Sequence, residues 1–227
     1  MALAEIVLHQ PTGVLYLACS TPSSRVAWVP ALGRFNATGA RNDYVATYDP
    51  ASSQVTRLSL VNFADGRGLS LHGMDVVPSS SDPSVLFVFL VNHRPPPDER
   101  SASLVGADSS IEIFKTTIGS DSMTHVRTVE DPIIHTPNDL VGDPDGKSFF
   151  FTNDHGEKVG IVSLIRPSRP DALTFINSYA DSISLGVPLP LLGIVMLGMA
   201  ASMPYPICME TMELHAPKTI LFTSPVR

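Results

Sequence analysis

Cysteine is almost absent from this chain of 227 residues, which contains only Cys19 and Cys208. Two cysteines so far apart offer no metal-binding spacing and at most one disulfide bond. The sequence therefore excludes a cysteine-based metal site and leaves the redox compartment undetermined.

Clusters of basic residues are missing as well. The formal net charge is −7 and the lysines and arginines are scattered singly, which argues against a nucleic-acid partner. Residues 1–20 carry no basic segment, and Glu5, His9 and Gln10 interrupt their apolar run, so no signal peptide is visible. The localisation stays open.

Three common catalytic motifs are also absent from the sequence: the G-x-S-x-G elbow, the P-loop and H-E-x-x-H. The side chains that remain for catalysis are histidines and oxygen-bearing groups. This combination favours metal-assisted attack by water.

Turn-forming residues, in contrast, are abundant, with 20 prolines and 15 glycines in a chain that is 44% hydrophobic. This composition is typical of many short strands joined by turns, so we expect an all-β fold. Strands are predicted at 5–9, 13–19, 43–49, 55–61, 73–77, 85–91, 110–115, 124–130, 138–142 and 148–153. The alternation of 43–49 and 55–61 predicts a hairpin. We expect a long loop at 20–43 and a surface insert at 94–110.

A repeated pattern organises residues 72–155. It reads LHGMDVVPSSSDPSVLFVFLVNH the first time and TPNDLVGDPDGKSFFFTNDH the second, and AEIVLHQPTGVLYLACS is a fainter copy. Corresponding points fall at Glu5, Asp75 and Asp139. Four short strands per unit at this spacing predict propeller blades. With about three units, we expect a partial β-propeller over residues 1–156 and an irregular tail over 157–227.

The tail contains residues 183–209, a run with no charged side chain. Its length reaches the roughly 20 apolar residues of a membrane span. Four prolines, at 188, 190, 204 and 206, make it a poor one, so membrane anchoring is an alternative rather than the expectation. A second alternative is that the tail arises from mis-splicing or a frameshift, because MELHAPKTIL can be read out of phase as the more propeller-like NGTARPKDDTL.

Two histidine positions stand at strand ends. His72 precedes Gly73, and a glycine lets the backbone approach a ligand closely. The alternative for His72 is a loop histidine that bonds to the backbone. Asn92 and His93 end the apolar run VLFVFLV, where a polar pair points either into solvent or into a channel.

Acidic and amide groups gather near turns. Asn138 and Asp139 offer oxygen ligands of the kind that Ca²⁺ prefers, with an Asx-turn as the alternative. The Asp154 carboxylate precedes His155 and is able to orient an imidazole. The segment DPDGK at 143–147 resembles part of an EF-hand loop, but the downstream Glu is missing, so a hairpin turn is predicted.

Taken together, HGM…VNH…IEIFK…PNDLV…FFFTNDH resembles the serum paraoxonase/arylesterase family over residues 5–156. These proteins are six-bladed β-propellers of the calcium-dependent phosphotriesterase type, and the opening VLHQPTGVLYLACS is similar to that of fungal-type members. The resemblance implies a calcium-dependent hydrolase that acts on a small-molecule aryl ester or lactone.

The resemblance also implies roles for single positions. His72 and His93 match the pair that activates the attacking water, and Asp154, next to His155, matches the carboxylate that supports the second histidine of that pair. Asn138 matches a ligand of the catalytic calcium. The positions that match the structural calcium site are Asp139, Glu5 and the carbonyl of Met74.

The chain also departs from the family pattern. Ala4 and Glu5 stand where the family has an adjacent Glu-Asp pair, so one acidic ligand is missing. The family continues through about three more blades with further calcium ligands, and no such motif follows His155. Since Ca²⁺ takes about six to eight oxygen ligands, weaker calcium binding is expected. Two alternative functions follow: an inactive propeller fragment that binds partners or self-associates through open edges, or a protein anchored in a membrane through 183–209.

Overall fold

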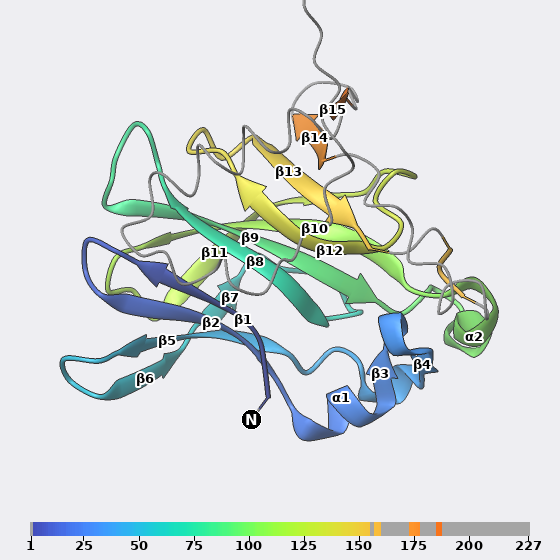
Figure 1. The fold of residues 1–227 in the computed structure, drawn as a ribbon. Helices are drawn as coiled ribbons and strands as arrows, with labels where there is room; N and C mark the ends of the chain where they lie inside the picture. Colours follow the sequence, from blue (N-terminus) through green and yellow to red (C-terminus); the bar gives the residue numbers. More distant parts are fainter. Residues whose placement is uncertain (1, 155–156, 160–172, 178–184, 188–227) are drawn as a thin grey trace, which may run out of the picture. The chain divides into compact units, whose positions relative to one another are not determined.

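The structure of this protein is a computed structural model that describes residues 2–154, 157–159, 173–177 and 185–187. The chain divides into two compact units, Met1–Leu189 and Pro190–Arg227, and every described residue belongs to the first. Its described part consists mainly of strands, with a few short helical turns, so the predicted all-β class is confirmed. Figure 1 shows the strands gathered into successive sheets.

Three large sheets follow one another along the chain, and each contains four antiparallel strands that pair in sequence order. The first contains β1 (Ala2–His9), β2 (Val14–Ser20), β5 (Tyr44–Asp49) and β6 (Gln54–Arg57). The second contains β8 (Leu71–Pro78), β9 (Val85–Arg94), β10 (Asp108–Thr117) and β11 (Ser122–Val129). The third contains β12 (Pro137–Gly142), β13 (Ser148–Asn153), β14 (Leu173–Asn177) and β15 (Leu185–Val187).

The first strands of the three sheets are neighbours, because β8 contacts β1 on one side and β12 on the other. Successive sheets pack face to face through apolar side chains. Tyr16, Ala18 and Val45 of the first sheet pack against the second in one core cluster. Phe89 and Phe149 meet in the next cluster, between the second and third sheets, with ring centroids 6.1 Å apart.

The predicted hairpin of 43–49 with 55–61 is only half correct. β5 pairs with β6 as expected, with Tyr48 opposite Val55. Leu58 is then buried and its N–H bonds to the carbonyl of Val45, after which the chain leaves the first sheet. The next residues form β7 (Ser59–Val61), which runs parallel to β11 in the second sheet. The alternating pattern continues through this crossing, because alternation indicates which side of a strand is buried and not which sheet the strand joins.

The third sheet extends beyond residue 156. β14 pairs with β13 and β15 pairs with β14, both antiparallel, so the third sheet has four strands like the first, whereas the second has a fifth strand, β7. Residues 155–156, 160–172, 178–184 and 188–227 lie outside the described part, and with them most of the apolar run 183–209. Among the residues that are described, no helix is long and apolar enough to cross a membrane.

Residues 20–43 fold into a compact cap instead of the expected long loop. The cap contains α1 (Pro22–Ala27), β3 (Trp28–Val29), β4 (Arg34–Phe35) and two short turns, Pro30–Leu32 and Ala37–Gly39. Thr21 starts α1 because its side chain accepts a hydrogen bond from Ser24 N–H (3.1 Å).

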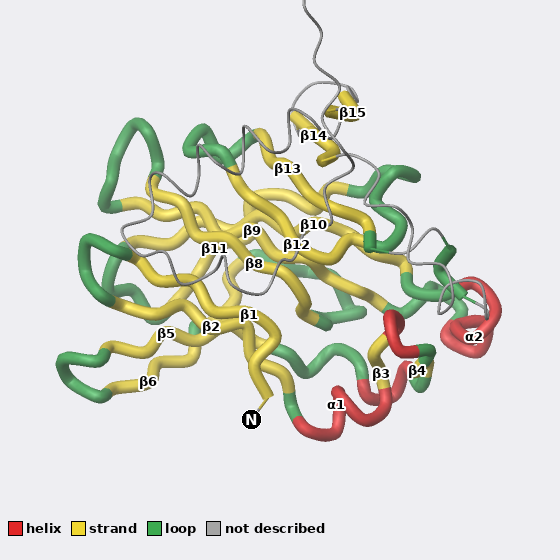
Figure 2. The backbone as a smooth tube through the Cα atoms, viewed as in Figure 1, coloured by secondary structure: helices red, strands yellow, loops and turns green. Residues whose placement is uncertain are grey.

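The insert 94–110 is largely exposed over residues 97–105, as predicted, but it also packs onto this cap. It carries a helical turn, Glu99–Ser101, and α2 (Ala102–Val105). Ala102 and Ala107 are buried against Trp28, which is only 2% exposed. Figure 2 shows the helical turns of both segments at one end of the strands. The small side chains of the insert allow this packing, so the cap and the insert form a satellite core.

Candidate active site

The residues that the sequence singles out come from three strands. His72 lies on β8, His93 on β9, and Asn138 on β12, while Asp154 directly follows β13. Three of them, His72, His93 and Asp154, line one pocket together with residues of the cap and the insert. The polar side chains that line this pocket are His72, His93, Ser109, His135, Thr136, Asp154, Glu157 and Lys158. Asn138 lies beside it through its contacts with His72 and Asp154.

The two histidines face each other, with ring centroids 5.5 Å apart. Burial lowers the pKa of His72 below the ordinary value of 6.5, and the charge of Arg25 adds to this effect. Burial lowers the pKa of His93 further, to about 3, with contributions from His72, Arg25 and Lys158. Both imidazoles are therefore neutral at pH 7, and His72 is the more basic of the two.

Asn138 connects His72 with Asp154. Its amide Nδ2 donates a hydrogen bond to Asp154 Oδ2 (2.9 Å) and lies 3.3 Å from His72 Nε2. The Asn138 amide is assigned so that its nitrogen donates to the Asp154 carboxylate. The same nitrogen then faces His72 Nε2, so Nε2 is the unprotonated ring nitrogen that carries the lone pair. Asp154 therefore reaches the first histidine through Asn138.

His93 is held from several sides at once. Its ring Nδ1 contacts Ser109 Oγ (3.0 Å), and its carbonyl accepts a hydrogen bond from Trp28 Nε1 (2.7 Å). Its N–H bonds to the carbonyl of Ser70 (2.8 Å). The cap therefore fixes the position of the buried histidine through its single tryptophan.

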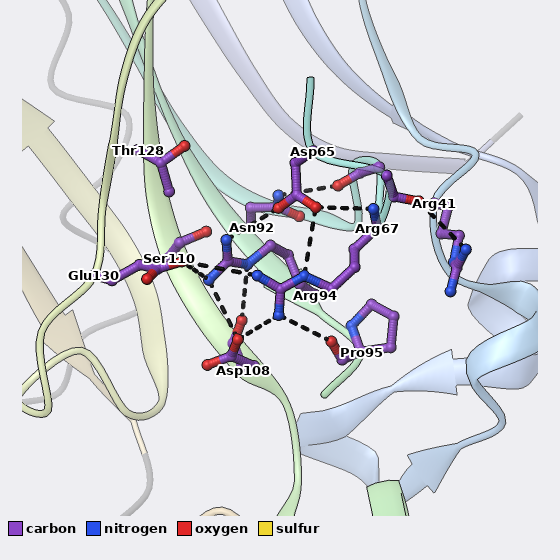
Figure 3. Close-up of polar contacts among 12 residues, drawn as sticks. Arg41, Asp65, Arg67, Asn92, Arg94, Pro95, Asp108, Ser110, Thr128 and Glu130 are labelled. Carbon is purple, nitrogen blue, oxygen red and sulfur yellow. Dashed lines mark hydrogen bonds and ion pairs between the residues drawn. The ribbon is translucent and has the colours of Figure 1, made fainter. Parts of the chain in front are cut away.

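An ion-pair network surrounds Arg94, the buried residue that follows His93 (Figure 3). Arg94, 2% exposed, pairs with Asp65 (3.0 Å), Asp108 (3.4 Å) and Glu130 (2.6 Å). Arg67 pairs with the same three carboxylates. Because Arg94 follows His93 and Asp108 precedes Ser109, the network fixes the two strand ends that carry the histidine and its hydroxyl partner.

The residues matched to the structural calcium site come from the three adjacent first strands. Glu5 lies on β1, Met74 on β8 and Asp139 on β12. Burial raises the carboxyl pKa of Glu5, and the nearby charge of Asp139 raises it further. Burial also raises the pKa of Asp139, although this side chain retains solvent exposure. Two carboxylates that repel each other at the meeting point of three sheets suit a bound cation.

Gly73 makes this arrangement possible. A Cβ at this position would lie 2.6 Å from the Asn138 carbonyl and 2.8 Å from Asp139 Oδ1. Only glycine allows β8 and β12 to approach so closely, which brings His72 and Asn138 into contact.

Side-chain ligands for a metal are few in the described part of the chain. It holds no group of three or more His, Cys, Asp or Glu side chains that could bind an ion together. An ion at Glu5 and Asp139 would complete its shell with backbone carbonyls, amide oxygens and water. The set fits Ca²⁺ in donor type but is short of the usual number of about six to eight.

Other predicted positions have structural roles. Asn92 is completely buried: its Oδ1 accepts from Ser70 N–H (2.8 Å) and its Nδ2 donates to the Gly68 carbonyl (3.1 Å). It therefore points neither into solvent nor into a channel. DPDGK forms the predicted turn between β12 and β13, with Gly146 N–H bonded to the Asp143 carbonyl. His155 lies outside the described residues.

Sequence reasoning missed Ser109, Trp28, Arg25 and Lys158, all of which act on the histidines. They belong to segments assigned to a loop, an insert and a tail. The one available signal was Trp28, because a single tryptophan in a stretch rich in Ser, Pro and Gly indicates a buried anchor.

Comparisons of this chain with models of protein families and with curated proteins found no match.

Proposed function

We propose that this protein is a calcium-dependent hydrolase of aryl esters or lactones, in which His72 activates the attacking water. The observation that supports the proposal most is the convergence of the His72–His93 pair and Asp154 in one pocket, with Asn138 beside them. His72 and Asn138 are 66 positions apart in the chain, so local sequence does not explain their meeting.

We also propose that the fold is part of a six-bladed β-propeller. Each of the three sheets contains four antiparallel strands that pair in sequence order, as a blade does. The first strands of successive sheets are neighbours, which is the arrangement around a propeller axis. His72, Glu5 and Asn138 lie on these first strands, where a propeller would carry its site.

His72 is the proposed general base. Its lowered pKa keeps the ring neutral at pH 7, and its Nε2 lone pair contacts Asn138 at 3.3 Å, a weak bond that a water can replace. The water proton passes to Nε2, the water oxygen bonds to the carbonyl carbon, and the ester C–O bond breaks with departure of the aryloxide or the ring alkoxide.

His93 and Asp154 position this base. The very low pKa of His93 makes it a poor proton acceptor, so its role is to pack against His72 and to bond Ser109. Asp154 holds the Asn138 amide, and its charge opposes the fall of the His72 pKa.

Calcium would be held by Glu5, Asp139 and the Met74 carbonyl at the structural position, and by Asn138 at the catalytic one. When bound, the ion supplies positive charge that polarises the ester carbonyl and stabilises the oxyanion. Because Glu5, Met74 and Asp139 belong to three different sheets, their shared ion would also stabilise the packing of these sheets.

Hydrolysis of phenyl acetate and of an aromatic lactone by the full chain tests the proposal. His72→Gln should lower kcat about 100-fold or more, because general-base catalysis contributes a factor of that order. A calcium chelator should abolish the activity and lower the melting temperature, and added Ca²⁺ should restore both.

His9→Gln is the matched control, since His9 is a buried histidine that does not line the pocket. It should retain the hydrolytic activity. Activity that survives both His72→Gln and the chelator would refute the mechanism, as would an equal loss in His9→Gln.

A second candidate function is self-association. β1 pairs with a strand on one side only in the sheet order, and it carries Leu3, Ile6 and Leu8 exposed. Edge strands with exposed aliphatic side chains promote association.

A further inference from the structure

Lys158 supplies a cationic group to the wall of the histidine pocket. Its Nζ donates one hydrogen bond, to the Ala107 carbonyl (3.1 Å). An ammonium group has three donors, and within the described residues Nζ makes no second hydrogen bond. Within the described residues no carboxylate oxygen lies within 4.0 Å of Nζ. A partly buried ammonium with free donors is suited to bind an anion.

The backbone of Lys158 is fixed by close packing. A Cβ on Gly106 would lie 2.7 Å from Lys158 Cβ and 3.1 Å from its carbonyl oxygen. Gly106 has a positive φ of 76° and ends α2, with its N–H bonded to the Ala102 carbonyl. The lysine is therefore anchored on the insert, and its side chain is held where it lines the pocket.

The separation of the ammonium and His93 follows from the segment that leads into β10, because Ala107 directly precedes this strand. Lys158 bonds to Ala107, and the His93 ring bonds to Ser109, two residues further along the chain. Two residues of extended chain span roughly 7 Å. A group bound by Lys158 would therefore lie a few bonds away from a carbonyl that reacts beside the histidines.

The two carboxylates that line the pocket are directed to partners other than Lys158. Asp154 is engaged by the Asn138 amide, and Glu157 is exposed to solvent. The positive charges of Arg25 and Lys158 extend to the pocket, because both contribute to the lowered pKa of His93. Both cations therefore lie close enough to the buried histidine to act on a bound group.

We infer that the pocket takes an ester or lactone whose acyl part carries a carboxylate, and that the Lys158 ammonium binds this carboxylate. The inference deepens the proposed hydrolase function and rests on it for the reaction, but binding of the anion alone is measurable without turnover. Lys158 is then a specificity-determining residue.

Two esters of matched shape test the inference: para-nitrophenyl hemisuccinate, which carries a carboxylate, and para-nitrophenyl isocaproate, its neutral counterpart. The quantity compared is the ratio of kcat/KM for the charged ester to that for the neutral ester. Lys158→Met should lower this ratio about tenfold or more, the effect expected of a charge-assisted hydrogen bond. Lys158→Glu should lower it further, and Lys158→Arg should retain most of it.

Lys115→Met is the control for net charge, because Lys115 is exposed on β10 and does not line the pocket. It should leave the ratio unchanged. Succinate should raise the melting temperature of the wild type and have less effect on Lys158→Met.

The outcomes separate the two proposals. If neither ester is hydrolysed but succinate stabilises the wild type through Lys158, the hydrolase proposal fails and the anion site stands. If His72-dependent hydrolysis occurs with the same ratio in the wild type and in Lys158→Met, the anion site is refuted and the hydrolase stands.

Discussion

His93 links the pocket to the stability of the fold. Its pKa is about 3 in the folded protein against an ordinary value of 6.5, chiefly because the ring is buried. Above pH 6.5 the ring is neutral in both the folded and the unfolded state, so its contribution to stability is fully present. As the pH falls from 6.5 toward 3, only the unfolded chain binds the proton, and that contribution is progressively lost.

Urea unfolding at pH values between 7 and 5 should show this loss. The free energy of unfolding of the wild type should fall with pH more steeply than that of His93→Gln, by up to about 1.4 kcal/mol per pH unit for one proton. Ser109→Ala is the control: it removes the hydroxyl contact but keeps the ring buried, so the steep slope should persist. Equal slopes in the wild type and in His93→Gln would contradict the assignment.

At the scale of strands, local sequence patterns predict where strands lie but not where the chain passes from one sheet to the next. Short apolar runs between turns located β8, β9 and β12 near 73–77, 85–91 and 138–142, and the first two extend by a few residues to include His72 and His93. Alternation did not locate the transfer of Ser59–Val61 to the second sheet, because Leu58 continues the same alternation while it changes the partner strand.

The sequence did not predict the cap, for a different reason. Its helical turns have three to six residues, too short for a periodic pattern, and its core is formed by alanines and one tryptophan from segments about 65 residues apart. Such contacts depend on tertiary packing and not on local propensity. Sequence reasoning therefore named His72, His93 and Asp154 of the pocket, but not Ser109, Trp28, His135 or Lys158.

The close approach of β8 and β12 is the element-scale feature on which the site depends. Gly73→Ala should destabilise the protein by about 2 kcal/mol, within the usual cost of overpacking, because its Cβ would meet backbone atoms of Asn138 and Asp139. Separation of the two strands should also weaken the His72–Asn138 contact and lower kcat.

Gly66→Ala is the matched control, because a Cβ there meets nothing within 4 Å. Its free energy of unfolding should change by no more than about 0.5 kcal/mol. Both variants are compared by urea unfolding and ester hydrolysis. A stable and active Gly73→Ala protein would show that the strands do not need this approach.

At the scale of the whole molecule, the first sheet has two different faces. Tyr16, Ala18 and Val45 point into the core shared with the second sheet. The alternate residues Leu17, Cys19 and Ala46 form a separate apolar cluster on the opposite face. Strand β1 borders that cluster with Leu3, Ile6 and Leu8, which are 43%, 47% and 43% exposed. A row of exposed aliphatic side chains beside an apolar cluster is a surface that a second copy of the chain is able to cover.

Sedimentation velocity over a range of concentrations tests whether this surface joins two copies. The wild type should shift to a larger species as its concentration rises, and Ile6→Lys combined with Leu8→Lys should remain monomeric, because burying two ammonium groups in an apolar contact is costly. Leu104→Lys is the control, since Leu104 is 75% exposed on α2, away from the first sheet. It should associate like the wild type. A wild type that stays monomeric at every concentration would refute self-association, and the exposed row on β1 would then be a solvent-facing surface of the monomer.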